Sequence, residues 1–290
     1  MDRSNFCGCK GVRTCIKCED VYGLQNSNSS ILDQVNDSYV YCSSCDLCWP
    51  GWDADSVKTH PNHNGESYKV EGIFVRNNFL SPMEETRLIQ DLDNIPWDAS
   101  QSGRRKQNFG PKCNFKKRKM KLGNFNGFPK STEFIQSRFK EVDLMRDYQT
   151  IEQCSLEYDP LRGASIDPHI DDCWVWGERI VTVNLLSDSV LTLRRYFGDT
   201  SKYNLIHAPY QLSENKASDR YPVIRIPMPK ASLLVLFGEA RYQWEHLIYR
   251  EDITSRRVCI AYREFTPMFL KDGEFESEGC AVIQKADNFF

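Results

Sequence analysis

Residues 179–186 read Arg-Ile-Val-Thr-Val-Asn-Leu-Leu, which has the length and composition of a short β-strand. Turn residues separate this stretch from its neighbours, and no long helical period intervenes. Five further segments of the same kind lie at 151–158, 190–194, 223–226, 232–237 and 257–265. Short strands with turn breaks predict two packed sheets rather than alternating strands and helices. We therefore predict a mainly β fold with flanking helices, namely a double-stranded β-helix (jelly roll).

A helix is expected ahead of these strands. Ser81 can cap its start, Pro82 suits the first turn, and Glu84 and Glu85 suit the positive end of the helix dipole. The apolar run 69–74 comes just before it and opens the main domain. The expected organisation is a cysteine-rich segment at 1–50, a linker at 51–68, a jelly-roll domain at 69–270 and a tail at 271–290. Two polar stretches, 22–38 and 195–222, are expected to be a spacer and a surface loop.

Composition limits the classes of protein to consider. The chain has 290 residues, of which 40% are hydrophobic, so it can build one sizeable core with a smaller appendage. Its net charge of −3 excludes a disordered acidic or basic protein. There is no apolar run of the roughly 18–20 residues that a membrane span needs, and no apolar leader at the amino terminus. We therefore expect an intracellular protein.

The cysteines are concentrated at the amino terminus, where seven of the twelve fall within the first 48 residues. In a reducing compartment such a cluster predicts metal ligands rather than disulfides. Cys7, Cys9, Cys15 and Cys18 have the compact spacing of a thiolate site, for which zinc is the first expectation. An iron–sulfur cluster and a metal-free segment are the alternatives. The further cysteines, which could supply additional ligands, are Cys42, Cys45 and Cys48.

An iron site is predicted from four residues. His169 and Asp171 are two positions apart on a strand-like segment, and alternate residues share one face of a strand. His246 follows a later apolar strand, and jelly rolls bring distant strands together. Two imidazoles and one carboxylate bind iron(II) on one side and leave positions open for a bidentate keto acid and oxygen. Arg257 opens the next strand, and its two-pronged guanidinium suits the far carboxylate of that keto acid.

Several of these segments together resemble the AlkB-type dioxygenases. The likeness extends over about residues 70–266, and its most specific element is the closing Arg-x5-Arg pair, Arg257 and Arg263. The amino-terminal cysteine pattern and the run 101–112 resemble one branch of that family, the AlkB homologue four proteins. The segments that carry the resemblance are 166–172, 179–186, 232–246 and 257–263.

The resemblance implies cofactors and an activity. Iron(II), 2-oxoglutarate and O2 would serve the reaction, with Arg257 on the 2-oxoglutarate carboxylate and Arg263, Tyr158 and Asn184 as further co-substrate-binding residues. The implied reaction hydroxylates an N-methyl carbon, which then leaves as formaldehyde. The branch is associated with methyl-lysine in actin and with N6-methyladenine in DNA. Methyl-lysine in a protein such as actin is the first expectation for the substrate, and N6-methyladenine in DNA is the alternative. Cytoplasm and nucleus are the expected locations.

A basic stretch runs from Arg104 to Lys121, with nine basic residues and no acidic ones. Its interleaved aromatic residues fit phosphate contact with base stacking. AlkB-type proteins place a substrate lid in this part of the chain, which here would include Arg104, Arg105, Lys106 and Phe109. An acidic protein surface such as that of actin, or a merely solvated, nuclear-import-like run, would suit the charges equally. A non-catalytic module that binds partners through the basic stretch and the cysteines is the alternative to an enzyme.

Overall fold

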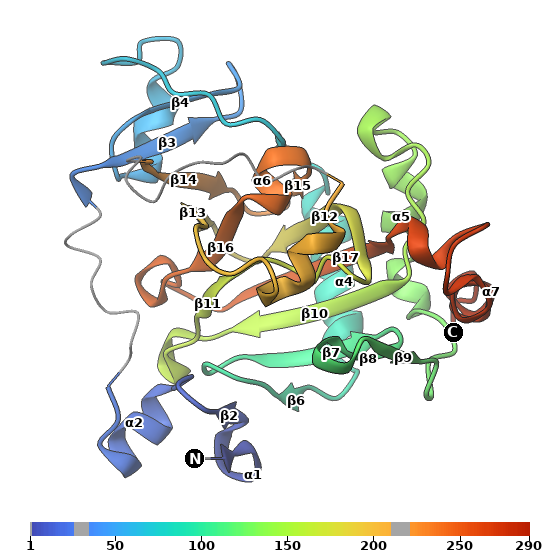
Figure 1. Ribbon diagram of the computed structural model, residues 1–290. Coiled ribbons are helices and arrows are strands. Elements are labelled where there is room, and N and C mark those ends of the chain that lie inside the picture. Colours follow the sequence, from blue (N-terminus) through green and yellow to red (C-terminus); the bar gives the residue numbers. More distant parts are fainter. Residues whose placement is uncertain (1, 26–34, 210–220) are drawn as a thin grey trace.

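The computed structural model describes residues 2–25, 35–209 and 221–290 and shows two large sheets packed face to face (Figure 1). The expected jelly roll is confirmed. The major sheet contains, in spatial order, β5 (Ile73–Arg76), β15 (Leu233–Leu236), β12 (Trp176–Leu185), β17 (Arg257–Phe265), β10 (Glu152–Tyr158), β7 (Arg105–Phe109) and β6 (Asp98–Ala99). The minor sheet contains β11 (Ile166–His169), β16 (Trp244–Ile248), β13 (Ser189–Arg195), β14 (Val223–Met228), β3 (Ser38–Cys42) and β4 (Leu47–Pro50).

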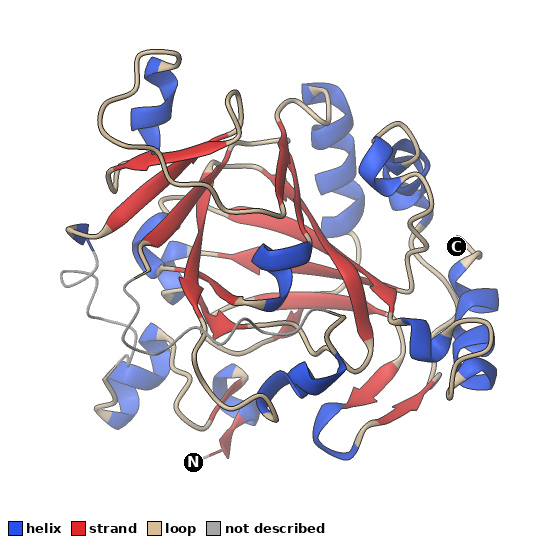
Figure 2. Cartoon of the chain, turned by 45° about the horizontal axis from the view of Figure 1, so that its top comes forward, coloured by secondary structure: helices blue, strands red, loops and turns tan. Residues whose placement is uncertain are grey.

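Two small hairpins and several helices complete the described part of the chain (Figure 2). The hairpins are β1 (Asp2–Arg3) with β2 (Cys9–Lys10), and β8 (Lys112–Asn114) with β9 (Lys119–Lys121). The α-helices are α1 (Ser4–Cys7), α2 (Ile16–Tyr22), α4 (Pro82–Asp93), α5 (Glu133–Phe139), α6 (Gly238–Tyr242) and α7 (Glu276–Ala286). The 3-10 helices are η1 (Ala54–Thr59), η2 (Phe115–Lys117), η3 (Lys130–Thr132), η4 (Asp143–Met145), η5 (Pro160–Arg162), η6 (Lys202–His207), η7 (Arg250–Asp252) and η8 (Pro267–Phe269).

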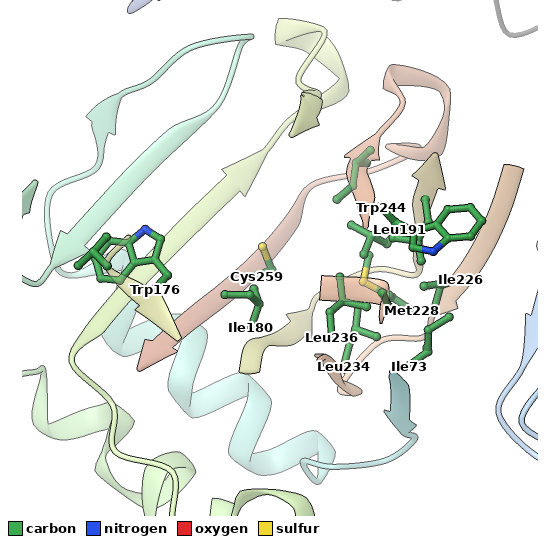
Figure 3. Packing of buried hydrophobic residues seen from close by; sticks show 14 of the residues in the cluster. Ile73, Trp176, Ile180, Leu191, Ile226, Met228, Leu234, Leu236, Trp244 and Cys259 are labelled. Carbon is green, nitrogen blue, oxygen red and sulfur yellow. The ribbon is translucent and has the colours of Figure 1, made fainter. Parts of the chain in front are cut away.

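The alternation of side chains along β12 explains why the major sheet is covered on both faces. Ile180 points into the space between the sheets, while Val181 and Val183 point to the opposite face. Figure 3 shows the inner cluster, to which the minor sheet contributes Leu191 and Trp244. The outer face packs against α4 and α5. Both faces of the major sheet are therefore removed from water. Burial of apolar surface is the main favourable term in folding.

Helix α4 begins where the sequence indicated. The Ser81 hydroxyl accepts a hydrogen bond from the Glu84 amide, and the Glu84 carboxylate accepts one from the Ser81 amide at 2.8 Å. The helix buries Leu88 and Leu92 against the outer face of the major sheet. No helix in the described part of the chain is long and apolar enough to cross a bilayer.

The expected segment boundaries differ from the architecture in two places. Strands β3 and β4 belong to the minor sheet, because Val223 on β14 pairs in parallel with Ser38, so residues 38–50 lie within the jelly roll. The expected tail at 271–290 contains α7, whose Gly279 packs against the backbone of Phe269 and whose Val282 is buried. Part of the expected spacer (26–34) and part of the expected loop (210–220) lie outside the described residues.

Candidate functional site

Three predicted ligands meet at one end of the barrel. His169 is the last residue of β11 and lies opposite His246 on β16 in the antiparallel register, with 4.2 Å between their ring centroids. Asp171 follows two residues later, and its Oδ1 lies 3.9 Å from His169 Nε2. One ligand atom from each residue lies within 4.8 Å of the other two. This set of donors fits a facial site for iron(II).

The protonation of the histidines suits metal binding. His169 Nδ1 lies 2.8 Å from the backbone carbonyl of Asp167, so a proton on Nδ1 leaves the Nε2 lone pair for the metal. Burial lowers the pKa of His169, and burial together with His169 holds the pKa of His246 well below its ordinary value. Both rings are therefore neutral near pH 7, as a metal ligand requires.

Arg257 lies deeper in the barrel with a guanidinium that is only partly satisfied. Its side chain is fully buried, and Nε donates a 2.6 Å hydrogen bond to Asn184 Oδ1. Both Nη atoms are buried and have no hydrogen-bond partner among the described residues. Buried donors of this kind need a partner, and two parallel N–H groups match a carboxylate. The far carboxylate of 2-oxoglutarate fits this position.

Asn184 and Tyr158 surround that arginine. The Asn184 amide nitrogen donates to the carbonyls of Ser187, Met228 and Pro229, so its oxygen is turned toward Arg257. Asn184 thus contacts Arg257 at Nε and leaves both Nη atoms to a ligand. Tyr158 is the register partner of Arg257 across β10 and β17, and the guanidinium carbon lies 4.7 Å from the Tyr158 ring centroid.

Arg263 points to the metal ligands. It contacts both oxygens of Asp171 at 3.1 Å and Glu152 at 2.6 Å. Burial alone would raise the pKa of Asp171, but the nearby positive groups, with Arg263 as the largest contributor, together outweigh burial and the pKa lies below its ordinary value. The sequence resemblance placed Arg263 near the co-substrate, whereas its contacts here are with two carboxylates of the protein. Glu152 was not foreseen, and its signal would have been its register position opposite Arg263.

The basic hairpin β8–β9 lies beside the metal ligands. Phe115 approaches Trp176, with 6.2 Å between ring centroids, and its carbonyl accepts a hydrogen bond from Asn204. Asn204 also donates to Asp172, the neighbour of Asp171, at 2.7 Å. Hairpin and η6 are therefore joined next to the site. Asp172 and Asn204 were missed by sequence reasoning, although Asp172 directly follows the His-x-Asp triplet.

The four residues predicted for the lid have different environments. Arg104 lies over Tyr158, with its guanidinium carbon 5.9 Å from the ring centroid. Arg105 is paired with Glu157, and Phe109 packs near Phe290. Lys106 is half-buried on β7. Arg104 therefore contacts a predicted co-substrate residue, and the exposed lysines belong to the hairpin that follows.

The four amino-terminal cysteines are brought together by a short β-ribbon and α2. Their sulfur atoms lie within 4.8 Å of one another, and Cys9, Cys15 and Cys18 are buried. Burial raises the pKa of the Cys15 thiol to about 11. A divalent metal would reverse that effect, because it stabilises thiolates directly. The donor set therefore fits zinc or an iron–sulfur cluster.

This cysteine segment packs next to the iron ligands. Arg13 Nε lies 3.3 Å from the carboxylate of Asp167, whose carbonyl faces His169. Arg250 makes a two-pronged contact with Glu19 on α2, at 2.8 and 2.9 Å. A side chain at Gly8 would collide with the backbone of Ser100, so the cysteine segment is in direct contact with the loop that contains Ser100.

A jelly roll with two histidines, one carboxylate and a buried, half-satisfied arginine defines an iron(II)- and 2-oxoglutarate-dependent dioxygenase. Sequence comparison gives the same class. A mouse protein named α-ketoglutarate-dependent dioxygenase alkB homolog 4 is 36% identical over 98% of this chain and 94% of its own length. Its human counterpart is also 36% identical over 98% of this chain and 94% of its own length. A Caenorhabditis elegans protein named DNA N6-methyl adenine demethylase is 31% identical over 96% of this chain and 93% of its own length.

This chain belongs to the AlkB family of 2-oxoglutarate-dependent dioxygenases. A search of protein-family profiles returned no match.

Proposed function

We propose that this chain oxidatively removes a methyl group from a nitrogen atom of a macromolecule, with iron(II), 2-oxoglutarate and O2. The observation that carries the proposal is that the two buried Nη atoms of Arg257 lack a hydrogen-bond partner within the described ranges of the chain. They lie in the same barrel as the histidine–aspartate set. An interaction module without catalysis would gain nothing from leaving two buried donors unpaired, since each costs stability.

Each residue has a definite part in holding the reactants. His169, Asp171 and His246 would hold the metal, and Arg257 would hold the distal carboxylate of the keto acid. Bound together, iron(II) and 2-oxoglutarate supply the oxidising chemistry that hydroxylates a C–H bond with O2. Hydroxylation of an N-methyl carbon yields an unstable product that releases formaldehyde.

The surrounding residues keep these groups in their required charge states. Arg263 keeps Asp171 ionised, and the Asp167 carbonyl keeps the Nδ1 proton on His169. Asn184 fixes the orientation of Arg257, so that little rotational freedom is lost when a carboxylate binds. This prearrangement favours one binding mode for the keto acid.

Two substrate classes are proposed. The name of the C. elegans relative supports N6-methyladenine in DNA, and the exposed lysines of the hairpin β8–β9 suit phosphate contacts. Methyl-lysine in an acidic protein such as actin, the first expectation from the family resemblance, suits the same lysines. Cytoplasm and nucleus are the proposed locations.

The decisive experiment compares both substrates in one assay. Succinate and formaldehyde are measured with N6-methyladenine DNA and with methyl-lysine peptide or intact methylated protein. We expect stoichiometric release from one class and loss of at least about a hundredfold in His169→Ala. Lys140→Ala, a change at an exposed residue that directly follows α5, is the control and should match the unaltered protein. Undiminished turnover in His169→Ala would refute the site, and no turnover with any methylated substrate would favour the non-catalytic alternative.

We also infer that the amino-terminal cysteines hold zinc. Metal analysis of protein purified without chelator should find one zinc per chain that is lost in the Cys15→Ser/Cys18→Ser variant. Cys280→Ser, an exposed cysteine on α7, is the matched control and should keep the metal. Iron with acid-labile sulfide in place of zinc would support the cluster alternative, and no metal would overturn both.

A further inference from the structure

A second group of metal-ligating side chains lies far from the iron site. Cys42 ends β3, Cys45 lies in the turn between β3 and β4, and His60 and His63 follow η1. One atom from each of the four lies within 4.8 Å of the others. The cluster is at the edge of the minor sheet, whereas β11 and β16 with the iron ligands form the opposite edge (Figure 1).

The distances match those around a tetrahedral zinc ion. Zinc bonds of about 2.3 Å to sulfur and about 2.0–2.1 Å to nitrogen give tetrahedral edges of about 3.6 Å for S···N and about 3.3 Å for N···N. Cys42 Sγ lies 3.7 Å from His60 Nδ1, and Cys45 Sγ lies 3.8 Å from His63 Nε2. His60 Nδ1 and His63 Nε2 are 3.2 Å apart. A hydrogen bond between the two rings would explain the last distance but not the convergence of both sulfurs.

The local structure resembles the way in which zinc sites are commonly supported. The Cys-x2-Cys pair is carried by a tight hairpin turn closed by a 2.9 Å bond from the Asp46 amide to the Cys42 carbonyl, with Asp46 itself at a φ of 56°. The Trp49 indole nitrogen lies 3.3 Å from Cys45 Sγ, and its ring stacks on His63 at 4.6 Å. These contacts orient a sulfur and an imidazole from the outside, as second-layer groups around metals do.

We propose that Cys42, Cys45, His60 and His63 form a structural zinc site, separate from that of Cys7, Cys9, Cys15 and Cys18. The site is closed, because four protein ligands complete the tetrahedron and leave no position for a substrate. Cys48 takes no part in it, although it lies in the same hairpin and is fully buried.

The role of this site is to fasten the segment 51–66 to the sheet edge. Most side chains of that segment are exposed or half-buried, so apolar burial holds it weakly. The anchors that it does have are nearby: Trp52 stacks 4.1 Å from the guanidinium carbon of Arg225, and Tyr68 pairs with Cys48 through backbone hydrogen bonds. A metal that links β3 to the residues after η1 would fix the segment 51–66 against the sheet. The segment would then cover part of the sheet edge beside β4.

The test is zinc content per chain in protein purified without chelator. We expect His60→Asn/His63→Asn to contain one zinc fewer than the unaltered protein and to exchange backbone amide hydrogens faster in 51–66. Cys48→Ala, the matched control in the same hairpin, should keep the full content. Because Cys15→Ser/Cys18→Ser removes metal only from the amino-terminal cluster, the two sites are counted independently of each other and of catalytic activity.

A second measurement keeps the test decisive if the double histidine variant does not fold. In His63→Cys the site keeps four ligands but gains a thiolate, so the cobalt-substituted protein should absorb more strongly in the sulfur-to-cobalt charge-transfer region than unaltered cobalt protein. The amino-terminal cluster is common to both samples and cancels in the difference. Equal zinc in the double histidine variant and the unaltered protein, or equal cobalt spectra, would overturn the proposal.

Discussion

Arg263 donates hydrogen bonds to both carboxylate oxygens of Asp171, each across 3.1 Å. A further hydrogen bond, to Glu152 at 2.6 Å, fixes the guanidinium through its third nitrogen. The arginine therefore compensates the charge of a buried metal ligand even before a metal arrives. Because Asp171 is held ionised, iron does not have to displace a proton from it.

Arg263→Lys should weaken iron binding. Lysine keeps the charge but cannot grip both oxygens of Asp171 and reach Glu152 together. We expect the dissociation constant for iron(II) to rise about 10- to 100-fold, measured by titrating turnover and by direct metal binding. Arg256→Lys is the control, since Arg256 pairs with Asp93 and Glu157 away from the metal. An unchanged constant in Arg263→Lys would show that Asp171 needs no such partner.

Arg257→Lys should affect the keto acid instead. The single ammonium group cannot reproduce two parallel donors, and Asn184 would lose the partner of its oxygen. We expect KM for 2-oxoglutarate to rise about tenfold or more, while iron affinity stays within twofold. Steady-state succinate formation over a range of 2-oxoglutarate concentrations checks this, and the Arg263→Lys variant gives the opposite pattern. A raised iron requirement with unchanged KM would contradict the assignment.

The fold and the iron ligands could be predicted because their signals are local or periodic. The alternation of Val181 and Val183 with Ile180, and the cap at Ser81, each depend on a few neighbouring residues. His169 and Asp171 share a strand face for the same reason.

Other features depend on pairings that no local pattern specifies. The parallel contact of Ser38 with Val223 joins residues far apart in the chain, so the sequence alone predicts a separate segment where β3 lies. The sequence likewise predicts a linker at His60 and His63, because nothing in their own neighbourhood shows that the turn at Cys45 lies beside them. Glu152 meets Arg263 through the β10–β17 register, and Asp171 reaches the same arginine from the segment after β11. The sequence specifies neither pairing.

The charge of the hairpin β8–β9 should control nucleic-acid affinity if DNA is the substrate. Lys116 and Lys117 on η2 are exposed at the hairpin tip. We expect Lys116→Ala/Lys117→Ala to weaken DNA binding and to lower the slope of log affinity against log salt by about 1–2, because roughly one counterion is released per phosphate contact. Lys140→Ala/Lys271→Ala removes the same charge elsewhere on the surface. Equal slopes in the two variants would exclude phosphate contacts by the hairpin.

A buried carboxylate should set part of the acid sensitivity of the fold. Glu157 is almost completely buried on β10 and contacts Arg105, Arg162 and Arg256. Burial alone would raise its pKa, but hydrogen bonds from Arg105 and Arg256 and the charge of Arg162 lower the pKa to about 2 from an ordinary value of 4.5. A pKa that is lower in the folded state stabilises it above the unfolded value, and this contribution disappears as the pH falls through the folded value.

Glu157→Gln should therefore lower the free energy of unfolding most near neutral pH. We expect a loss on the order of 1–2 kcal/mol at pH 7, less than the full pKa difference implies, because solvent reaches the three arginines. The gap from the unaltered protein should narrow as the pH falls from about 4.5 toward 2. Urea unfolding at several pH values measures this difference in unfolding free energy, with Glu141→Gln at an exposed residue as the control. A gap that stays constant with pH would mean that packing rather than charge stabilises this part of β10.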